Sequence, residues 1–349
     1  MKKILFAVLA ACTLIFAGCS KTEVKNEFGW WTDYDECLAA AKKNDKNVIL
    51  LISRDGSDKV SAGLKESVFH KPEFNSMFGE NFELCEIDIS PELFVKANPK
   101  KDAPKEEKRD SKKYKKILDK RMRVVTTHGV QMTPTLYIAT KQGYIIRDIL
   151  YMPCDSVESF AELVDPYRDE IVEFCELVSA VENAKGTEKV RAIDTLYEAA
   201  NRNYRYQMTD LMRQVEKLDK KNETGLVGKY VLSLATSDAM DAYLARKPES
   251  VCAIYEKVAK HPRLSDDQRQ QAYYAAAYVV GSNTPTPEET TKLIELLEKA
   301  IEIDANSGIG QRCTELLAQV KDFKIRQDEL QKKVEAEGAQ EDAEDSAEN

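Results

Sequence analysis

The sequence predicts two domains, an α/β domain followed by an all-α domain of helical hairpins. In residues 28–165, short apolar runs alternate with helical patterns, as expected for a sheet covered by helices. Residues 166–330 carry apolar stripes of helical period throughout. The length of 349 residues agrees with two domains of ordinary size.

Composition narrows the possible functions. The chain is 43% hydrophobic, and its 14 Gly and 11 Pro are few, which favours long helices over a many-turned β protein. The net charge of −9 argues against a nucleic-acid partner, which needs a basic surface. Only three His are present, which excludes a His-rich metal site. No apolar stretch reaches the roughly 18 residues that a transmembrane helix needs.

Residues 1–19 have the pattern of a signal peptide. Lys2 and Lys3 precede an apolar segment, residues 4–17, which is too short for a permanent membrane span. The pattern predicts export from the cytoplasm.

The end of this segment, FAGCS at residues 16–20, resembles the lipobox of bacterial lipoproteins, with Phe in place of the usual Leu or Val. The resemblance implies that Cys19 carries lipid and anchors the chain to a membrane of the cell envelope, facing the periplasm, with residues 20–27 as a tether. Ser20 stands where an Asp retains many lipoproteins at the inner membrane, which points to the outer membrane. The alternative is ordinary signal cleavage within this motif, with the cysteine incidental.

The α/β domain is predicted to contain four strands and three helices. The five residues 48–52 (VILLI) are all apolar, as in a strand covered on both faces. In chain order we expect a helix over Tyr34–Lys43 capped by Asp33, a strand over Asn47–Ile52, a helix over Ala62–Phe69, strands over Phe82–Ile89, Thr135–Ala139 and Tyr144–Leu150, and a helix over Val157–Val164.

Four segments occur in the order and spacing of the thioredoxin fold. They are residues 31–46, residues 64–74 (LKESVFHKPEF), residues 128–135 (HGVQMTPT) and residues 143–153. The domain therefore resembles the thioredoxin family over residues 28–164, and most closely its exported, disulfide-reductase-like branch.

The site of the family's dithiol departs from its pattern. The family places Cys-x-x-Cys at the start of the helix that continues into Leu64, and here the two positions are Asp58 and Ser61. Dithiol chemistry needs a thiolate nucleophile and a second thiol to resolve the mixed disulfide. No Cys lies between Cys37 and Cys85, so redox catalysis at this site is not expected.

Thr133 and Pro134 match the family's proline at the entry to the third strand. A proline, expected to be cis, belongs to this fold with or without chemistry, and we favour that interpretation. The resemblance also implies that the backbone beside it receives an extended peptide by strand-like hydrogen bonds. Thr133 and Pro134 are therefore candidate peptide-binding residues.

The segment from Lys96 to Arg123 is strongly basic, with 13 Lys and Arg against five Asp and Glu. Residues 112–123 have a sparse apolar stripe and are predicted to be helical. A solvated crossover helix is the interpretation we favour. The other is a patch for anionic lipid headgroups, cell-wall polymers or an acidic partner.

The all-α domain begins at Asp165 and Pro166, residue types that suit a helix cap and first turn. Residues 255–260 (YEKVAK) and 297–302 (LEKAIE) are similar, and residues 303–307 (IDANS) look like the turn of a tetratricopeptide repeat. We therefore expect a helical-hairpin array of tetratricopeptide-like character. Residues 331–349, with seven acids and no base after Lys333, are predicted to be a disordered acidic tail.

No catalytic motif occurs, and the six Cys that follow Cys19 stand apart from one another in sequence. The sequence therefore predicts a redox-inactive envelope lipoprotein that binds protein partners or peptides as a scaffold or chaperone-like component. No catalytic residue, metal, cofactor or nucleic-acid partner is expected. Residues 166–330 are expected to contribute most of the affinity, and a shallow groove formed by the Asp58–Ser61 loop and the Thr133-Pro134 turn is expected to contribute specificity at most. The alternative is a thiol–disulfide oxidoreductase that uses a displaced thiol, such as Cys37 or Cys154.

Overall fold

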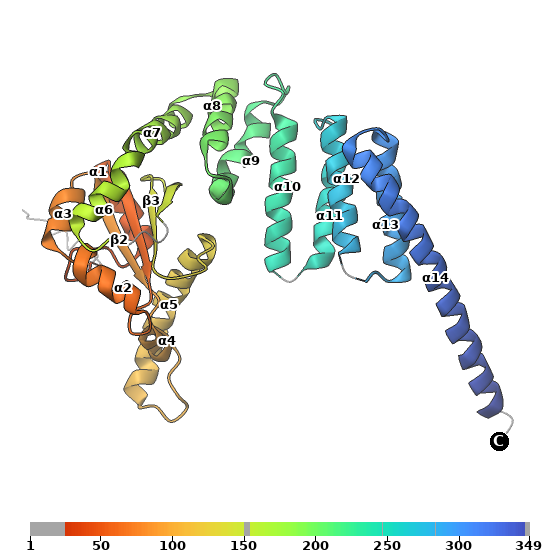
Figure 1. Cartoon of the computed structure of the whole chain (residues 1–349), viewed down its shortest axis with the longest axis horizontal. Coiled ribbons are helices and arrows are strands. Elements are labelled where there is room, and N and C mark those ends of the chain that lie inside the picture. The colour runs from red at the N-terminus through yellow and green to blue at the C-terminus, as the bar shows by residue number, and fades with distance from the viewer. Residues whose placement is uncertain (1–24, 150–153, 246, 283, 346–349) are drawn as a thin grey trace, which may run out of the picture. The chain divides into compact units, whose positions relative to one another are not determined.

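A computed structural model describes residues 25–149, 154–245, 247–282 and 284–345, in two compact units (Figure 1). The first unit is Met1–Asp165 and the second is Pro166–Asn349. The predicted signal peptide, Cys19 and residues 20–24 of the tether lie outside the described residues.

The first unit contains a mixed four-stranded sheet, of order β2-β1-β3-β4. Its strands are β1 (Asn47–Ser53), β2 (Phe82–Asp88), β3 (Thr135–Ala139) and β4 (Ile145–Ile149). β2 runs parallel to β1, whereas β3 is antiparallel to both β1 and β4. The buried run of β1 fits its central place in the sheet, and the predicted α/β class is confirmed.

Six helices and one π-helical turn accompany the sheet in the described part of this unit. They are α1 (Tyr34–Asn44), α2 (Lys59–Leu64) with the turn η1 (Lys65–Phe69), α3 (Pro72–Phe78), α4 (Pro91–Ala97), α5 (Lys105–Thr127) and α6 (Val157–Val164). Asp33 caps α1 as predicted, accepting from the backbone of Asp35 and Glu36.

Four helical features differ from the prediction. The helix expected over Ala62–Phe69 begins at Lys59, where Asp58 caps it, and its second half is the π-helical turn η1. The sequence gives no expectation of α3 or α4, because seven residues are too few to show an apolar stripe, although both helices begin with proline. α5 begins at Lys105 rather than Lys112, because its first two turns carry charge but no apolar residue.

The described part of the second unit is helical. Its α-helices are α7 (Arg168–Asn183), α8 (Gly186–Ala199), α9 (Thr209–Leu218), α10 (Val227–Leu244), α11 (Pro248–Ala259), α12 (Asp266–Gly281), α13 (Pro287–Ile303) and α14 (Gly308–Asp345), with 3₁₀ turns η2 (Asp165–Tyr167) and η3 (Arg202–Met208). From α9 onward each helix packs against the next, as in a hairpin array.

The turn between α13 and α14 is held by a buried amide. Gln270 of α12 donates to the carbonyl oxygens of Ala300 and Asp304, at 2.8 and 2.7 Å, and accepts from Ser307 at 2.6 Å. These bonds satisfy carbonyls at the end of α13 that have no partner within the helix.

The predicted disordered tail is corrected in part, because α14 continues to Asp345. Residues 331–345 are rich in Ala, Glu, Gln and Lys, which are strong helix formers, so a polar composition did not prevent a helix. No helix in the described ranges is both long and apolar enough to cross a bilayer.

The open edge of β2 is covered by the segment that precedes α1. The backbone N–H of Trp31 donates to Leu84 at 2.8 Å, and that of Glu86 donates back to Trp31 at 2.8 Å. The ammonium of Lys25 lies 4.4 Å from the centre of the Trp31 ring. Lys25, which falls in the segment predicted to be a tether, therefore packs against the folded domain.

A buried ion pair joins the turn η1 to β2. The ammonium of Lys65, 6% exposed, contacts Glu86, 7% exposed, and lies 2.6 Å from Asp55. The other carboxylate oxygen of Glu86 lies 2.9 Å from both Asn26 Nδ2 and His70 Nε2. Burial would raise the pKa of Glu86, but His70 and Lys65 hold it below its usual range.

Removing one partner of this pair should destabilise the first unit. Glu86→Gln leaves the Lys65 ammonium buried with Asp55 as its remaining carboxylate contact, at a cost of about 3 kcal/mol. The double variant Lys65→Met/Glu86→Leu, which buries no ion, should lose less. Urea unfolding followed by tryptophan fluorescence measures this unit alone, because Trp30 and Trp31 are the chain's two tryptophans.

The exposed pair Glu92–Lys96 supplies the control. Glu92→Gln should leave the unfolding midpoint unchanged. A neutral Glu86→Gln, or a double variant that loses as much as the single one, would contradict this account of the ion pair.

Candidate functional site

Asp58 and Ser61, the residues predicted to occupy the dithiol positions, lie close to the proline turn. Asp58 caps α2, accepting from Val60 N at 3.0 Å and from the Ser61 hydroxyl. The hydroxyl of Thr133 also donates to Asp58. The Thr133–Pro134 peptide bond is cis. The structure thus brings together Asp58, Ser61, Thr133 and Pro134. This group is called the rim below, because it borders a pocket.

The rim is an anionic hydrogen-bonding site rather than a nucleophilic one. Burial would raise the pKa of Asp58, but hydrogen bonds from Ser61, Val60 and Thr133 outweigh it and hold the pKa below its usual range. A serine nucleophile needs a base such as histidine within hydrogen-bond reach. Ser61 donates to Asp58 instead, so its hydroxyl has no such activation.

The three histidines are engaged elsewhere. His70 pairs with Glu86, and His261 lies 3.1 Å from Glu216 in the second unit. His128 is buried, with Nδ1 donating to Val124 at 2.8 Å, and burial lowers its pKa. In the described residues, moreover, no three His, Cys, Asp or Glu side chains gather as metal ligands would.

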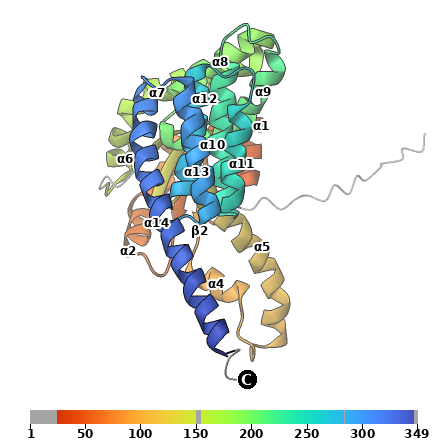
Figure 2. The ribbon, with the colours of Figure 1, turned by 90° about the vertical axis from the view of Figure 1, so that its right-hand side faces the viewer.

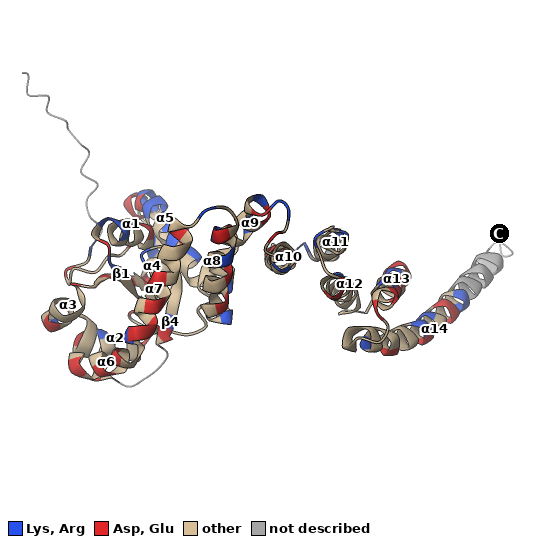
Figure 3. Cartoon of the chain, turned by 90° about the horizontal axis from the view of Figure 1, so that it is seen from above, with Lys and Arg blue, Asp and Glu red and all other residues tan. Residues whose placement is uncertain are grey.

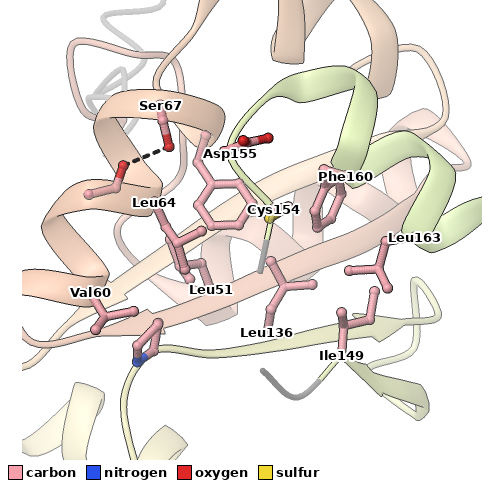
Figure 4. Close-up of a pocket in the computed structure, with 13 residues that line it drawn as sticks. Leu51, Val60, Leu64, Ser67, Leu136, Ile149, Cys154, Asp155, Phe160 and Leu163 are labelled. Carbon is pink, nitrogen blue, oxygen red and sulfur yellow. Dashed lines mark hydrogen bonds between the residues drawn. The ribbon is translucent and has the colours of Figure 1, made fainter. Parts of the chain in front are cut away.

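An apolar pocket of about 580 Å³ lies next to this rim. Figure 4 shows α2 side chains on one side, α6 side chains on the other and sheet residues between them. The lining residues come from α2 and η1 (Val60, Gly63, Leu64, Ser67, Phe69), the proline turn and sheet (Pro134, Leu51, Leu136, Ile149), the segment leading into α6 (Cys154, Asp155) and α6 itself (Phe160, Leu163). The volume lies within the range of about 300–1,000 Å³ that small ligands occupy.

Few polar groups enter the pocket. The Ser67 hydroxyl already donates its hydrogen bond to the Gly63 carbonyl at 2.8 Å (Figure 4). Asp155 and the thiol of Cys154 are the remaining polar members of the lining. A Cβ added at Gly63 would meet no atom within 4 Å, so a larger side chain there would enter open space.

The described thiols of the first unit are buried or half-buried. Cys37 and Cys85 are fully buried, and burial together with the neighbouring Cys37 raises the pKa of Cys85. Cys154 is half-buried in the pocket lining, and burial raises its pKa also. A thiol at raised pKa is mostly protonated at neutral pH and is a poor nucleophile.

A shallow groove beside Pro134 was predicted, but an apolar pocket of this volume was not. Its walls include Leu64, Phe69 and Phe160, which the sequence presents as ordinary core positions on two helices. The sequence holds one signal, the small residue Gly63 within an apolar helix face. A single glycine does not by itself indicate a pocket.

The chain was compared with known proteins. A family model, TP_0391_C, described as an uncharacterised protein C-terminal domain, matches residues 226–325, in the second unit. A search of curated proteins returns no match. A solved structure titled "DsbH Oxidoreductase" is similar at 14% identity and a TM-score of 0.30, over 42% of this chain and 88% of that chain. A likeness of that size carries no argument about activity.

Replacing the cap residue should separate its two roles. Asp58→Ala removes the acceptor for Val60 and Ser61 and should cost about 1 kcal/mol of unfolding free energy. Asp58→Asn retains the cap but not the charge. Because the folded pKa lies below the ordinary 3.8, the stabilisation from the charge is complete above that value and is lost as pH falls through the folded pKa.

The difference in unfolding free energy between wild type and Asp58→Asn should therefore shrink as the pH is lowered. Urea unfolding at several pH values, followed by tryptophan fluorescence, measures it. A difference that grows towards acid pH would show that the carboxylate is not held ionised by its neighbours.

Proposed function

We propose that this chain is a redox-inactive, thioredoxin-fold lipoprotein of the bacterial cell envelope that binds protein or peptide partners. The sheet order and the position of α2 before the proline turn support the thioredoxin fold for the first unit. The successive packing of α9 to α14 supports a tetratricopeptide-like array for the second. The apolar pocket beside Pro134 is the observation that carries the binding function.

The pocket suits one large apolar side chain of an extended peptide. The thioredoxin resemblance implies that the backbone at Thr133 pairs with such a peptide, which would set its side chains at the pocket beside Pro134. Burying a Leu or Phe side chain contributes about 1.5–3 kcal/mol, or about 10- to 100-fold in affinity. Asp58, which is ionised, disfavours an acidic residue at the rim.

The pocket bears on the division of roles that the sequence predicts, with affinity from residues 166–330 and specificity from the groove at Pro134. The sequence favours residues 166–330 as the main source of affinity, whereas the pocket lies wholly in the first unit. We therefore assign the side-chain-specific part of binding to the pocket and leave a broader docking role to the helical unit.

The alternative function is thiol–disulfide exchange through Cys154. One observation favours it, because Cys154 and Pro134 line the same pocket. Two observations oppose it: burial raises the pKa of Cys154, and the pocket lining in the described residues holds no second thiol to resolve a mixed disulfide.

Filling the pocket should weaken peptide binding. The probe is a fluorescein-labelled peptide of Ser, Gly and Thr with one central Leu, and the reference carries Asp at the centre. The Leu peptide should bind the mature chain at least about tenfold more tightly, measured by fluorescence anisotropy. Gly63→Leu and Ser67→Leu should each remove most of that difference, because both residues line the pocket.

Ala62→Leu is the matched control, since Ala62 is exposed and does not line the pocket. Equal binding of the two peptides, or equal loss in the control, would refute the pocket as the binding site.

Redox activity should be absent. The mature protein should not accelerate the reduction of insulin by dithiothreitol above background, because Asp58 and Ser61 occupy the thiol positions. Turbidity of the precipitating insulin chain is the measurement. Turnover that disappears in Cys154→Ser or Cys37→Ser would establish the alternative function instead.

Membrane anchoring depends on one cysteine. Expressed in a Gram-negative host, the full chain should partition into the detergent phase of a Triton X-114 extraction, and Cys19→Ala should move it to the aqueous phase. A wild-type protein found in the aqueous phase would mean that the lipobox interpretation is wrong.

A further inference from the structure

Helix α1 carries a buried cysteine on the face that packs against β2. Figures 2 and 3 agree in placing α1 and α5 on one side of the sheet and α2 and α6 on the other. The buried residues of α1 are Tyr34, Cys37 and Ala41, at intervals of three and four. Residues at such intervals share one face of a helix, and α1 packs on β2, so Cys37 points towards the sheet.

A second cysteine, on β2, faces this helix. Successive side chains of a strand point to opposite faces, so Glu83, Cys85 and Ile87 share one face of β2. Glu83 accepts a hydrogen bond from Asn44 Nδ2, at the end of α1, at 2.7 Å. Ile87 lines a small pocket together with residues at the start of α1. Cys85 stands between these two contacts and therefore faces the middle of α1.

The two cysteines meet in the core. The structure holds both as thiols, fully buried, with a hydrogen bond between their side chains. A disulfide needs Cβ atoms about 3.5–4.5 Å apart, which two thiols in contact can reach by side-chain rotation. Among the described cysteines these two are the only candidates for each other. Cys154 lines the pocket beside α6, and the remaining three follow residue 165, in the second unit.

We propose that Cys37 and Cys85 form a disulfide when the chain folds in an oxidising compartment. The bond ties α1 to β2 and closes the segment that contains β1, α2 and α3. The inference goes beyond the proposed function and shares one premise with it, the export that the signal-peptide pattern predicts, because disulfides persist mainly outside the cytoplasm. Neither the rim nor the pocket takes part in it.

The reaction is an exchange with a disulfide-bearing oxidant, such as glutathione disulfide or an oxidised dithiol protein. The thiolate of one cysteine attacks a sulfur of the oxidant, which forms a mixed disulfide and releases one thiolate. The thiolate of the other cysteine attacks the chain's sulfur in that bond, which closes the Cys37–Cys85 disulfide and releases the second thiolate. The two thiols lose two electrons and two protons, and the oxidant becomes two thiols. Because both sulfurs are fully buried after folding, the oxidant reaches them before α1 docks on the sheet.

Counting free thiols tests the proposal on the chain from residue 20 onward, which has six cysteines. The reduced protein is unfolded in urea, refolded with a mixture of reduced and oxidised glutathione, and alkylated in denaturant with N-ethylmaleimide. Mass spectrometry should find four alkylated cysteines, the six less the pair, and all six after prior reduction with dithiothreitol. In a digest without reductant, the peptide that contains Cys37 should be linked to the peptide that contains Cys85.

Three variants make the result specific. Cys37→Ala and Cys85→Ala should each remove the link and leave five alkylated cysteines, whereas the matched control Cys154→Ala should keep the link and leave three. Reduction should lower the urea midpoint of the wild type, followed by tryptophan fluorescence, by about 1–2 M. It should leave the midpoint of Cys85→Ala unchanged. Circular dichroism of each variant confirms that it folds.

Three outcomes would overturn the proposal. They are six alkylated cysteines after refolding with glutathione, a link from either residue to a different cysteine, and a midpoint that reduction lowers equally in Cys85→Ala. The full chain expressed in a Gram-negative host should carry the same link in the envelope fraction, and free thiols there would also overturn it. A chain found in the cytoplasmic fraction would contradict the predicted export instead, and the glutathione experiment would still decide the pairing.

Discussion

The buried contact between Lys65 and Glu86 fixes how α2 and η1 lie on the sheet. Lys65 also reaches Asp55 in the loop before α2, and Glu86 holds His70 at the other end of the turn and Asn26 in the segment that covers β2. A buried charge without its partner is costly, so this arrangement has few alternatives. The wall of the pocket depends on this ion pair, because Leu64 precedes Lys65 and Phe69 follows it by one helical turn.

With that helix fixed, the chemistry of the rim follows from its residues. Asp58 and Ser61 hydrogen-bond to each other at the start of α2, at the positions where the thioredoxin resemblance would place two cysteines. The rim therefore offers an acceptor and the pocket an apolar interior, with no reactive thiolate between them. These properties favour the proposed binding function over thiol chemistry, because burial also raises the pKa of the half-buried Cys154.

The order of an α/β unit and a helical unit could be predicted because the signals are local: an apolar run in β1 and long stripes in helices such as α13. The meeting of Asp58 with Thr133 followed only from the family resemblance. The pocket and the Lys65–Glu86 pair could not be predicted, because their members come from separate segments and look like ordinary helix and strand residues. α3 and α4 were missed because each is two turns long.

The proposed function requires the first unit to capture an apolar side chain beside Pro134. Methyl-labelled NMR of the mature chain, with the Leu-centred peptide as the probe, detects such a contact. The account predicts intermolecular contacts from the peptide's Leu methyl groups to the methyl groups of Leu64, Leu136 and Leu163, which line the pocket. Contacts found only to residues 166–330 would contradict it and would assign binding to the helical unit.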